Sequence, residues 1–191
     1  MRQVENARKQ RTMNVKLASV SIAAMVCAVV AYPCKTTRRV SNVDMVREAD
    51  AIVRARAENY TVAPKASPSS TGFDVESDSR IRFKVLEVIR GKVPGDLILP
   101  GVLADTDDFN DHPPPYNLVR PDGRSGSCFA SSYRSRGEFL LMLKKRGDSE
   151  FTLDWYPLAP VNEQLHPLSD PWLMWVREQA QGPSSKFAAH H

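Results

Sequence analysis

Two segments of this chain alternate between apolar and charged side chains, and they constrain the fold more than any other feature. In residues 51–62, AIVRARAENYTV, three small apolar residues alternate with two arginines and a glutamate. Residues 81–89 repeat the alternation, with a break near Leu86 and Glu87 that indicates a bulge or a bend. Alternation with a period of two is typical of strands with one buried and one exposed face. The chain is therefore expected to be built around a β-sheet.

Further strands are expected at three places. Residues 96–101, DLILPG, follow a turn rich in glycine and proline. Residues 138–145, EFLLMLKK, form a continuous apolar run bounded by charges, which indicates a buried strand, and residues 151–161, FTLDWYPLAPV, predict one more. Residues 63–80 and 102–127 are rich in proline, acids and small polar residues, and we expect them to be loops without regular structure.

A short helix is expected at each end of the predicted sheet. Residues 41–50 begin with Ser41, a favourable N-cap, and place apolar residues at spacings of three. Residues 169–182 combine a capping residue, a proline in the first turn and a terminal glycine, and Trp172 and Trp175 are expected to pack this helix on the sheet. The predicted fold class is mainly β, a small barrel or sandwich with an N-terminal and a C-terminal helix.

The first 31 residues predict export. Five basic residues and one acid precede the uncharged stretch LASVSIAAMVCAVVA. This stretch is shorter than the roughly 20 residues of a spanning helix and fits a secretory signal followed by cleavage. Small residues before Tyr32 predict that the mature chain begins there; Met13 is an alternative start, and an uncleaved N-terminal anchor is an alternative outcome. The expected location is secreted, periplasmic or at the cell surface.

Cleavage at this point would leave a neutral chain. Of the 26 basic and 22 acidic residues, five and one leave with the signal, so 21 of each remain. A neutral chain gives no general electrostatic reason to bind nucleic acid, and none is expected as a partner. One observation favours nucleic-acid binding. The neighbouring predicted strands carry a basic face, formed by Arg54, Arg56, Arg80, Arg82 and Lys84.

The cysteine count follows from the same cut. Cys27 lies inside the apolar signal, so Cys34 and Cys128 remain as an even pair in an oxidising compartment, and we predict a structural disulfide between them. The alternative is a secreted hydrolase that uses Cys128 or the acidic loop, which would require a base beside an accessible thiolate. The sequence GRSGS misses the G-x-S-x-G elbow because Ser127 replaces its last glycine.

The long acidic, proline-rich loop is the predicted binding region, because long loops in compact domains are often functional. Its acids do not follow the calcium-loop pattern, since Phe109 falls at a ligand position. We predict no metal, no cofactor and no catalytic residue. The residues expected to contact a partner are Asp105, Asp107, Asp108, Asn110, Asp111, His112, Tyr116, Arg120 and Arg124.

Four segments in order, VREADAIVRARA, FKVLEVIRGKVPG, GSCFASSYRSRGEFLLML and DPWLMWVRE, resemble the bacterial secreted proteins with a netrin-like, tissue-inhibitor-of-metalloproteinase-like (TIMP-like) OB fold. The resemblance covers most of residues 34–180. It implies a five-stranded Greek-key barrel, an N-terminal segment tied to it by a disulfide, and protein binding. The animal inhibitors chelate zinc through a Cys-x-Cys start. Here Thr36 replaces the second cysteine and Pro33 precedes the first, so this mechanism is not transferred.

These observations predict a non-enzymatic exported protein. Its parts are a signal peptide at residues 1–31, an OB-like domain with a C-terminal helix at residues 32–182, and a flexible tail at residues 183–191. The expected partner is a protein or a cell-envelope component, and membrane contact is expected only through an uncleaved N-terminal segment. Inhibition of an extracellular protease is a further alternative.

Overall fold

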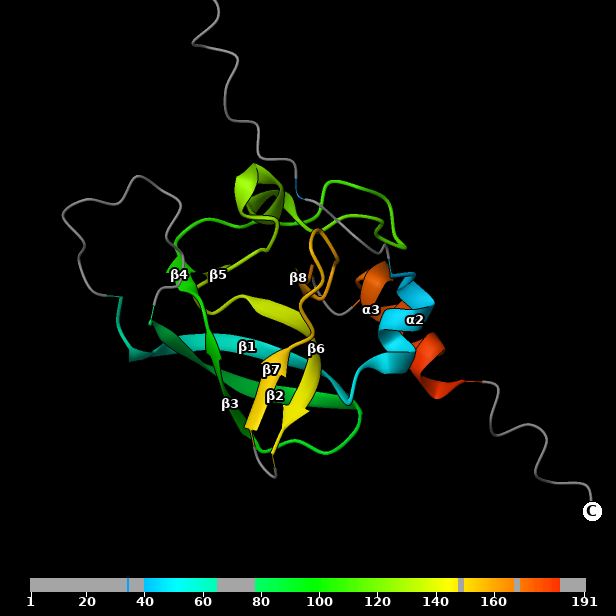
Figure 1. Ribbon diagram of the computed structural model, residues 1–191, viewed down its shortest axis with the longest axis horizontal. Helices are drawn as coiled ribbons and strands as arrows, with labels where there is room; N and C mark the ends of the chain where they lie inside the picture. The colour runs from blue at the N-terminus through cyan, green and yellow to red at the C-terminus, as the bar shows by residue number, and fades with distance from the viewer. Residues whose placement is uncertain (1–33, 35–39, 65–77, 148–149, 167–168, 183–191) are drawn as a thin grey trace, which may run out of the picture. The chain divides into compact units, whose positions relative to one another are not determined.

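A mainly antiparallel sheet forms the centre of the structure (Figure 1). The structure is a computed structural model, and it describes residue 34 and residues 40–64, 78–147, 150–166 and 169–182. The predicted signal peptide and tail lie outside these residues, as does most of the predicted loop at residues 63–80. Among the helices of the described ranges, none is long and apolar enough to cross a membrane.

The strands of the main sheet follow the order β3-β2-β1-β6-β7, and β8 pairs with β6. They are β1 (Ala51–Val62), β2 (Arg80–Arg90), β3 (Asp96–Pro100), β6 (Glu138–Arg146), β7 (Glu150–Leu153) and β8 (Asn162–Gln164). Neighbouring strands in this sheet are antiparallel. Two short strands, β4 (Val102–Ala104) and β5 (Ser132–Arg134), form a separate parallel pair.

Strands β1 and β2 confirm the two segments predicted from alternation. The alternating apolar residues of β1 are buried, and the charged residues between them are partly exposed. Arg54 pairs with Glu87 and the next residue, Ala55, pairs with Val85, so Leu86 is an extra residue on β2. An extra residue opposite a continuous ladder is a β-bulge, and the predicted break near this position is therefore confirmed.

The continuous apolar run of β6 is buried on both of its faces. Phe139 and Leu141 belong to a core shared with β1, β2 and β3. Leu140 and Met142 belong to a second core, on the opposite face, with the helices α2 (Asn42–Glu48) and α3 (Pro171–Gln181). A strand covered on both faces needs apolar side chains at consecutive positions, which explains why β6 does not alternate.

Both predicted helices are present and lie side by side (Figure 1). The hydroxyl of Ser41 accepts a hydrogen bond from the backbone N of Asp44 at 3.1 Å, so it caps α2 as predicted. The carboxylate of Asp170 caps α3 by accepting from the backbone N of Trp172 at 2.8 Å. Trp172 is fully buried and stacks on Trp175, which confirms that these residues pack α3 onto the domain.

The mainly β class with a helix at each end is confirmed, but the prediction of a closed barrel is wrong. The sheet is open in the described part of the chain: its edge strands β3 and β7 come near each other without pairing. The reason is the short reach of β7. It has four residues and pairs only with residues 143–146 of β6, so it cannot supply a ladder that closes the sheet onto β3.

Two predicted boundaries are also corrected. The strand expected at residues 151–161 ends at Leu153. Further along, Pro157 and Pro160 lack the N–H group that a ladder requires, so the rest of the segment is poorly suited to a strand. The segment expected to be an irregular loop contains β4 and a short π-helical turn, η1 (Gly123–Ser127). Gly126 takes a positive φ of 124° within that turn, a conformation that glycine adopts without steric cost.

Candidate functional site

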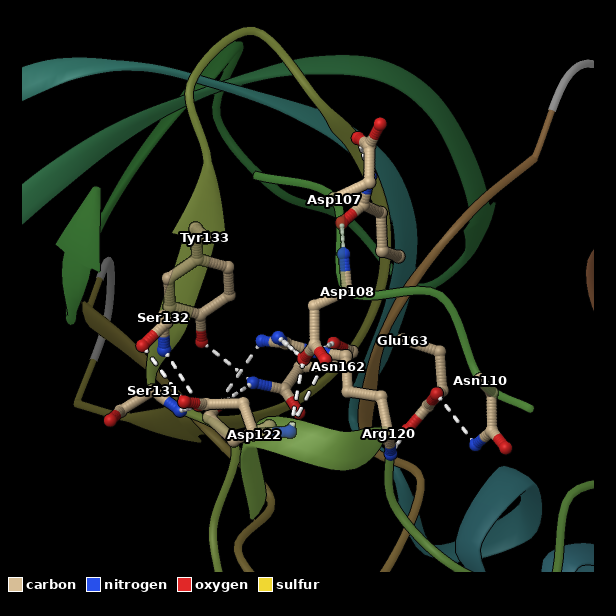
Figure 2. Close-up of polar contacts among 12 residues, drawn as sticks. Asp107, Asp108, Asn110, Arg120, Asp122, Ser131, Ser132, Tyr133, Asn162 and Glu163 are labelled. Carbon is tan, nitrogen blue, oxygen red and sulfur yellow. Dashed lines mark hydrogen bonds and ion pairs between the residues drawn. The ribbon is translucent and has the colours of Figure 1, made fainter. Parts of the chain in front are cut away.

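The long connection between β4 and β5 carries the candidate site, and a buried arginine fastens it to the sheet (Figure 2). The Arg120 side chain is fully buried. Its Nη1 donates to the Asp108 carboxylate at 2.5 Å, and its Nε donates to the backbone oxygen of Asn162 at 3.1 Å. The guanidinium also lies 5.3 Å from the ring centre of Tyr133, within cation–π range. Because an unpaired buried charge is costly, these contacts fix the position of residue 120 in the loop.

A buried carboxyl group, Glu163 on β8, holds the loop at a second point. One of its oxygens accepts from the backbone N of Arg120 at 3.1 Å, and the other accepts from Nδ2 of Asn110 at 2.9 Å. Burial raises the pKa of Glu163 to about 7, against the lowering effect of the Asn110 hydrogen bond and of the Arg120 charge. Near neutral pH the carboxyl group is therefore divided between its charged and neutral forms.

Asp122 connects the loop to the start of β5. Its carboxylate accepts from the backbone N of Ser131 at 2.8 Å, and from the backbone N and hydroxyl of Ser132 at 3.0 and 2.9 Å (Figure 2). The backbone N of Asp122 in turn donates to the Asp108 carboxylate at 3.2 Å. Asp108 thus joins Arg120 and Asp122 in one network, and the two ends of the loop are held together.

The other two residues of β8 contact the same loop. Gln164 donates through Nε2 to Asp107 at 2.6 Å, and its Oε1 accepts from the backbone N of Asp108 at 2.8 Å. Asn162 donates through Nδ2 to the hydroxyl of Tyr133 at 2.7 Å. Burial raises the pKa of the Tyr133 phenol to about 12, so this group stays neutral at physiological pH. All three residues of β8 therefore serve the loop or the strand that follows it.

Part of the predicted binding set is buried. Asn110, Tyr116 and Arg120 are each less than a tenth exposed, and the side chain of Asp108 is 20% exposed. Tyr116 packs against Trp172, with 5.2 Å between ring centres. These side chains support the loop from inside.

The remaining predicted residues are at the surface, and three of them lie together. Arg124 pairs with the carboxylate of Asp111, and its Nη1 lies 3.2 Å from Nε2 of His112. We call Asp111, His112 and Arg124 the ridge; their side chains are 60%, 45% and 25% exposed. The hydrogen bond from Arg124 lowers the pKa of Asp111, so this carboxylate is charged at neutral pH. Asp105 and Asp107 are exposed as well but do not join this cluster.

The predicted disulfide is present between Cys34 and Cys128. Their Cα atoms lie 5.8 Å apart, within the range of disulfide geometry. Cys128 follows directly after η1 and takes a positive φ of 65°, and its backbone oxygen accepts from the backbone N of Leu158 at 2.7 Å. The bond therefore ties the chain at residue 34 to the end of the loop that carries the ridge.

Sequence reasoning missed Asp122 and the whole of β8. The three side chains of β8 are polar and buried without alternation, so no periodic pattern marked them as an inward-facing strand. Their contacts with the loop span 32 to 57 residues of sequence, a distance at which local patterns carry no information. The one available signal was a run of three hydrogen-bonding side chains directly after Val161.

Three of the loop acids are engaged by protein donors. Asp107 accepts from Gln164, Asp108 from Arg120 and Asp111 from Arg124. A hard cation would have to displace these donors to gain several oxygen ligands from one place. In the described residues no group of three or more histidine, cysteine or carboxylate side chains is arranged to hold a metal ion.

Comparison with known proteins assigns no family to this chain. No protein-family model matches it, and no curated protein matches it either. Its function is therefore inferred from the positions and chemistry of its own residues.

Proposed function

We propose that this chain is an exported, non-enzymatic protein-binding module on a netrin-like, TIMP-like OB scaffold, and that its partner docks on the ridge. The partner is a protein of the cell envelope or of the exterior. One observation carries the proposal: the charged ridge is exposed, while the loop that presents it is held from below by the buried Arg120 and Glu163. A loop with this support keeps one shape without a partner, and binding then costs less conformational entropy.

The strand order supports the scaffold. The consecutive strands β1, β2 and β3 are neighbours, and β6 returns after a long connection to pair with β1. This 6-1-2-3 arrangement has the order of a Greek key, in which the fourth strand lies beside the first. OB folds are five-stranded Greek-key barrels that are partly open. The edge strands β3 and β7 lie near each other without pairing, which is compatible with a partly open barrel.

The length of the connection supports a binding role for it. Strands β4 and β5 are paired neighbours, yet residues 105–131 separate them. Ordinary connections are about 4 to 6 residues long, and irregular ones beyond about 15 are usually functional or disordered. Hydrogen bonds and an ion pair within this connection hold it in place, which favours a functional role over disorder.

The same contacts weaken the hydrolase alternative. A nucleophilic Cys128 needs a free thiolate, and the bond to Cys34 occupies its sulfur. An acidic-loop mechanism needs a carboxyl group that is free to take or give a proton. Asp107, Asp108 and Asp111 are each bonded to an amide or guanidinium donor instead.

Site-specific crosslinking tests the proposed ridge. A photoreactive residue replaces His112 in the full chain, produced in its native host, and a second preparation carries it at Lys145, an exposed position at the end of β6. We expect one discrete protein adduct from position 112 and none from position 145. The captured protein, once purified, should bind the wild type and lose about tenfold in affinity for the double variant Asp111→Ser, Arg124→Ser. Equal adducts at both positions, or unchanged affinity of the double variant, would contradict the proposal.

Export is tested separately by the intact mass of the chain recovered outside the cytoplasm without reductant. We expect a chain that begins at Tyr32 and lacks two hydrogens relative to the reduced form. A mass that includes residues 1–31 would favour the anchored alternative. A free thiol at Cys128 would remove the main argument against the hydrolase alternative.

A further inference from the structure

A shallow groove on the sheet, which shares no residue with the ridge, carries an excess of positive charge. Its volume is about 570 Å³. Strands β1, β2 and β3 and the turn before β6 contribute to its lining. Four of the lining residues are basic and two are acidic, namely Arg56, Arg82, Lys84 and Arg136 against Glu58 and Asp96.

The basic residues of the groove outnumber its acids, and most of them form no ion pair. Within the described residues Arg82, Lys84 and Arg136 are exposed and form no ion pair, whereas Arg56 pairs with Glu58 at 2.8 Å. The strand register places Lys84 directly opposite Arg56 on β1 and, on its other side, directly opposite Asp96 on β3. Like charges in directly opposed positions destabilise a sheet. A bound anion would relieve this repulsion, so the groove is electrostatically suited to a negative ligand.

The backbone on both sides of the groove departs from regular geometry. Strand β1 has a bulge at Glu58 and Asn59, where two residues stand opposite Arg82 alone. On the other side Arg136 has a φ of 61°, in the left-handed region that non-glycine residues seldom occupy. Bulges are over-represented next to active sites, because they re-aim side chains. These features are independent of the charge and favour a built binding surface.

The spacing of the cations fits an extended peptide. Arg82 and Lys84 are alternate residues of one strand, so their side chains leave the same face about 7 Å apart. An extended peptide has the same spacing between its alternate side chains, so two of its carboxylates can meet both cations. Asn59 is exposed and offers an amide to the peptide backbone. Ile98, directly opposite Arg82 and 57% exposed, offers an apolar contact beside it.

We propose that this groove binds an extended acidic peptide segment with carboxylates at alternate positions. Two observations favour a peptide over single-stranded nucleic acid. The lining contains no aromatic side chain on which a base could stack, and stacking supplies much of the affinity for single strands. The carboxylates of Glu58 and Asp96 would also repel a continuous phosphate chain, whereas a peptide can place uncharged residues against them.

Fluorescence anisotropy with the full oxidised chain tests the proposal. The probe is a labelled peptide of alternating serine and glutamate, and we expect saturable binding that weakens as salt is added. The variant Arg82→Ser, Lys84→Ser should bind about tenfold more weakly. The control variant Lys145→Ser, Arg146→Ser removes the same charge from exposed positions at the end of β6 and should bind as the wild type does.

A third variant is expected to bind the peptide more tightly, an effect that partial unfolding of the variant could not produce. Asp96→Ser removes a carboxylate that competes with the ligand, so it should tighten binding several-fold. A peptide of the same composition with its glutamates adjacent should bind more weakly than the alternating one. Equal loss in the two double variants, no binding of the alternating peptide, or tighter binding of a thymidine oligonucleotide or a sulfated dextran would each overturn the proposal.

Discussion

Glu163 makes the stability of the domain depend on pH. Burial raises its pKa from 4.5 to about 7. Below pH 4.5 the carboxyl group is protonated in the folded and the unfolded chain alike. Between pH 4.5 and 7 the unfolded chain loses this proton while the folded chain keeps it, so the free energy of unfolding falls as the pH rises. The difference between these two pKa values corresponds to about 3 kcal/mol, which is lost by the time the pH passes 7.

The variant Glu163→Gln isolates this contribution. Glutamine stays neutral at every pH and has the shape of the protonated acid. The glutamine amide and the protonated carboxyl group each offer only one good acceptor. Two donors share it, the backbone N of Arg120 and Nδ2 of Asn110. The variant should therefore resemble the wild type at pH 4.5, and by pH 8 its advantage in free energy of unfolding should have grown by about 3 kcal/mol.

Urea unfolding followed by tryptophan fluorescence between pH 4.5 and 8 measures this difference, with the disulfide kept oxidised. Glu150→Gln, which removes an exposed carboxylate at the start of β7, serves as the control and should give no comparable trend. A difference between wild type and Glu163→Gln that stays constant over the range would refute the reasoning. A difference that grows in favour of the wild type as the pH rises would show instead that Glu163 is held as a stabilised carboxylate.

Three further predictions concern stability and use the same urea unfolding assay. Arg120→Met should lower the free energy of unfolding by about 3 to 5 kcal/mol, because Asp108 loses its buried cation; a loss below about 1 kcal/mol would contradict that role. Replacing both Cys34 and Cys128 by serine should cost about 4 to 5 kcal/mol, since the bond spans a sequence separation of 94; an unchanged urea midpoint would argue against it. Asp170→Ala should cost about 2 kcal/mol through its lost bonds to α3, whereas Asp170→Asn should recover most of this stability.

The sequence allowed the regular parts of the fold to be predicted because their determinants are local. Alternation in residues 51–62 follows directly from one buried and one exposed face, and the cap at Ser41 acts on a backbone group three residues away. Closure of the sheet has no such local signal. It depends on whether β3 and β7, which are far apart in the sequence, come close enough to pair.

The sequence singled out the loop as a candidate, but not the separate roles of its side chains. Acid and proline content marked the loop, yet Asp108 and Asp111 look alike in sequence. The first is bonded to the buried Arg120, and the second is paired with Arg124 at the surface. The distinction comes from the buried Arg120, whose backbone N donates to Glu163 of β8 across 43 residues of sequence. Only a three-dimensional arrangement separates such chemically identical side chains.

The same arrangement explains why this loop is held by polar contacts. Few large apolar side chains are present between β4 and β5, so hydrophobic burial alone cannot fix so long a segment. Hydrogen bonds and ion pairs are directional, and they select one conformation where a loose apolar contact would allow several. That selection makes the loop sensitive to single groups, because each buried partner that is removed leaves another one unsatisfied. Asn110 shows the connection most directly: it donates to Glu163 below and accepts from the backbone N of His112 in the ridge above.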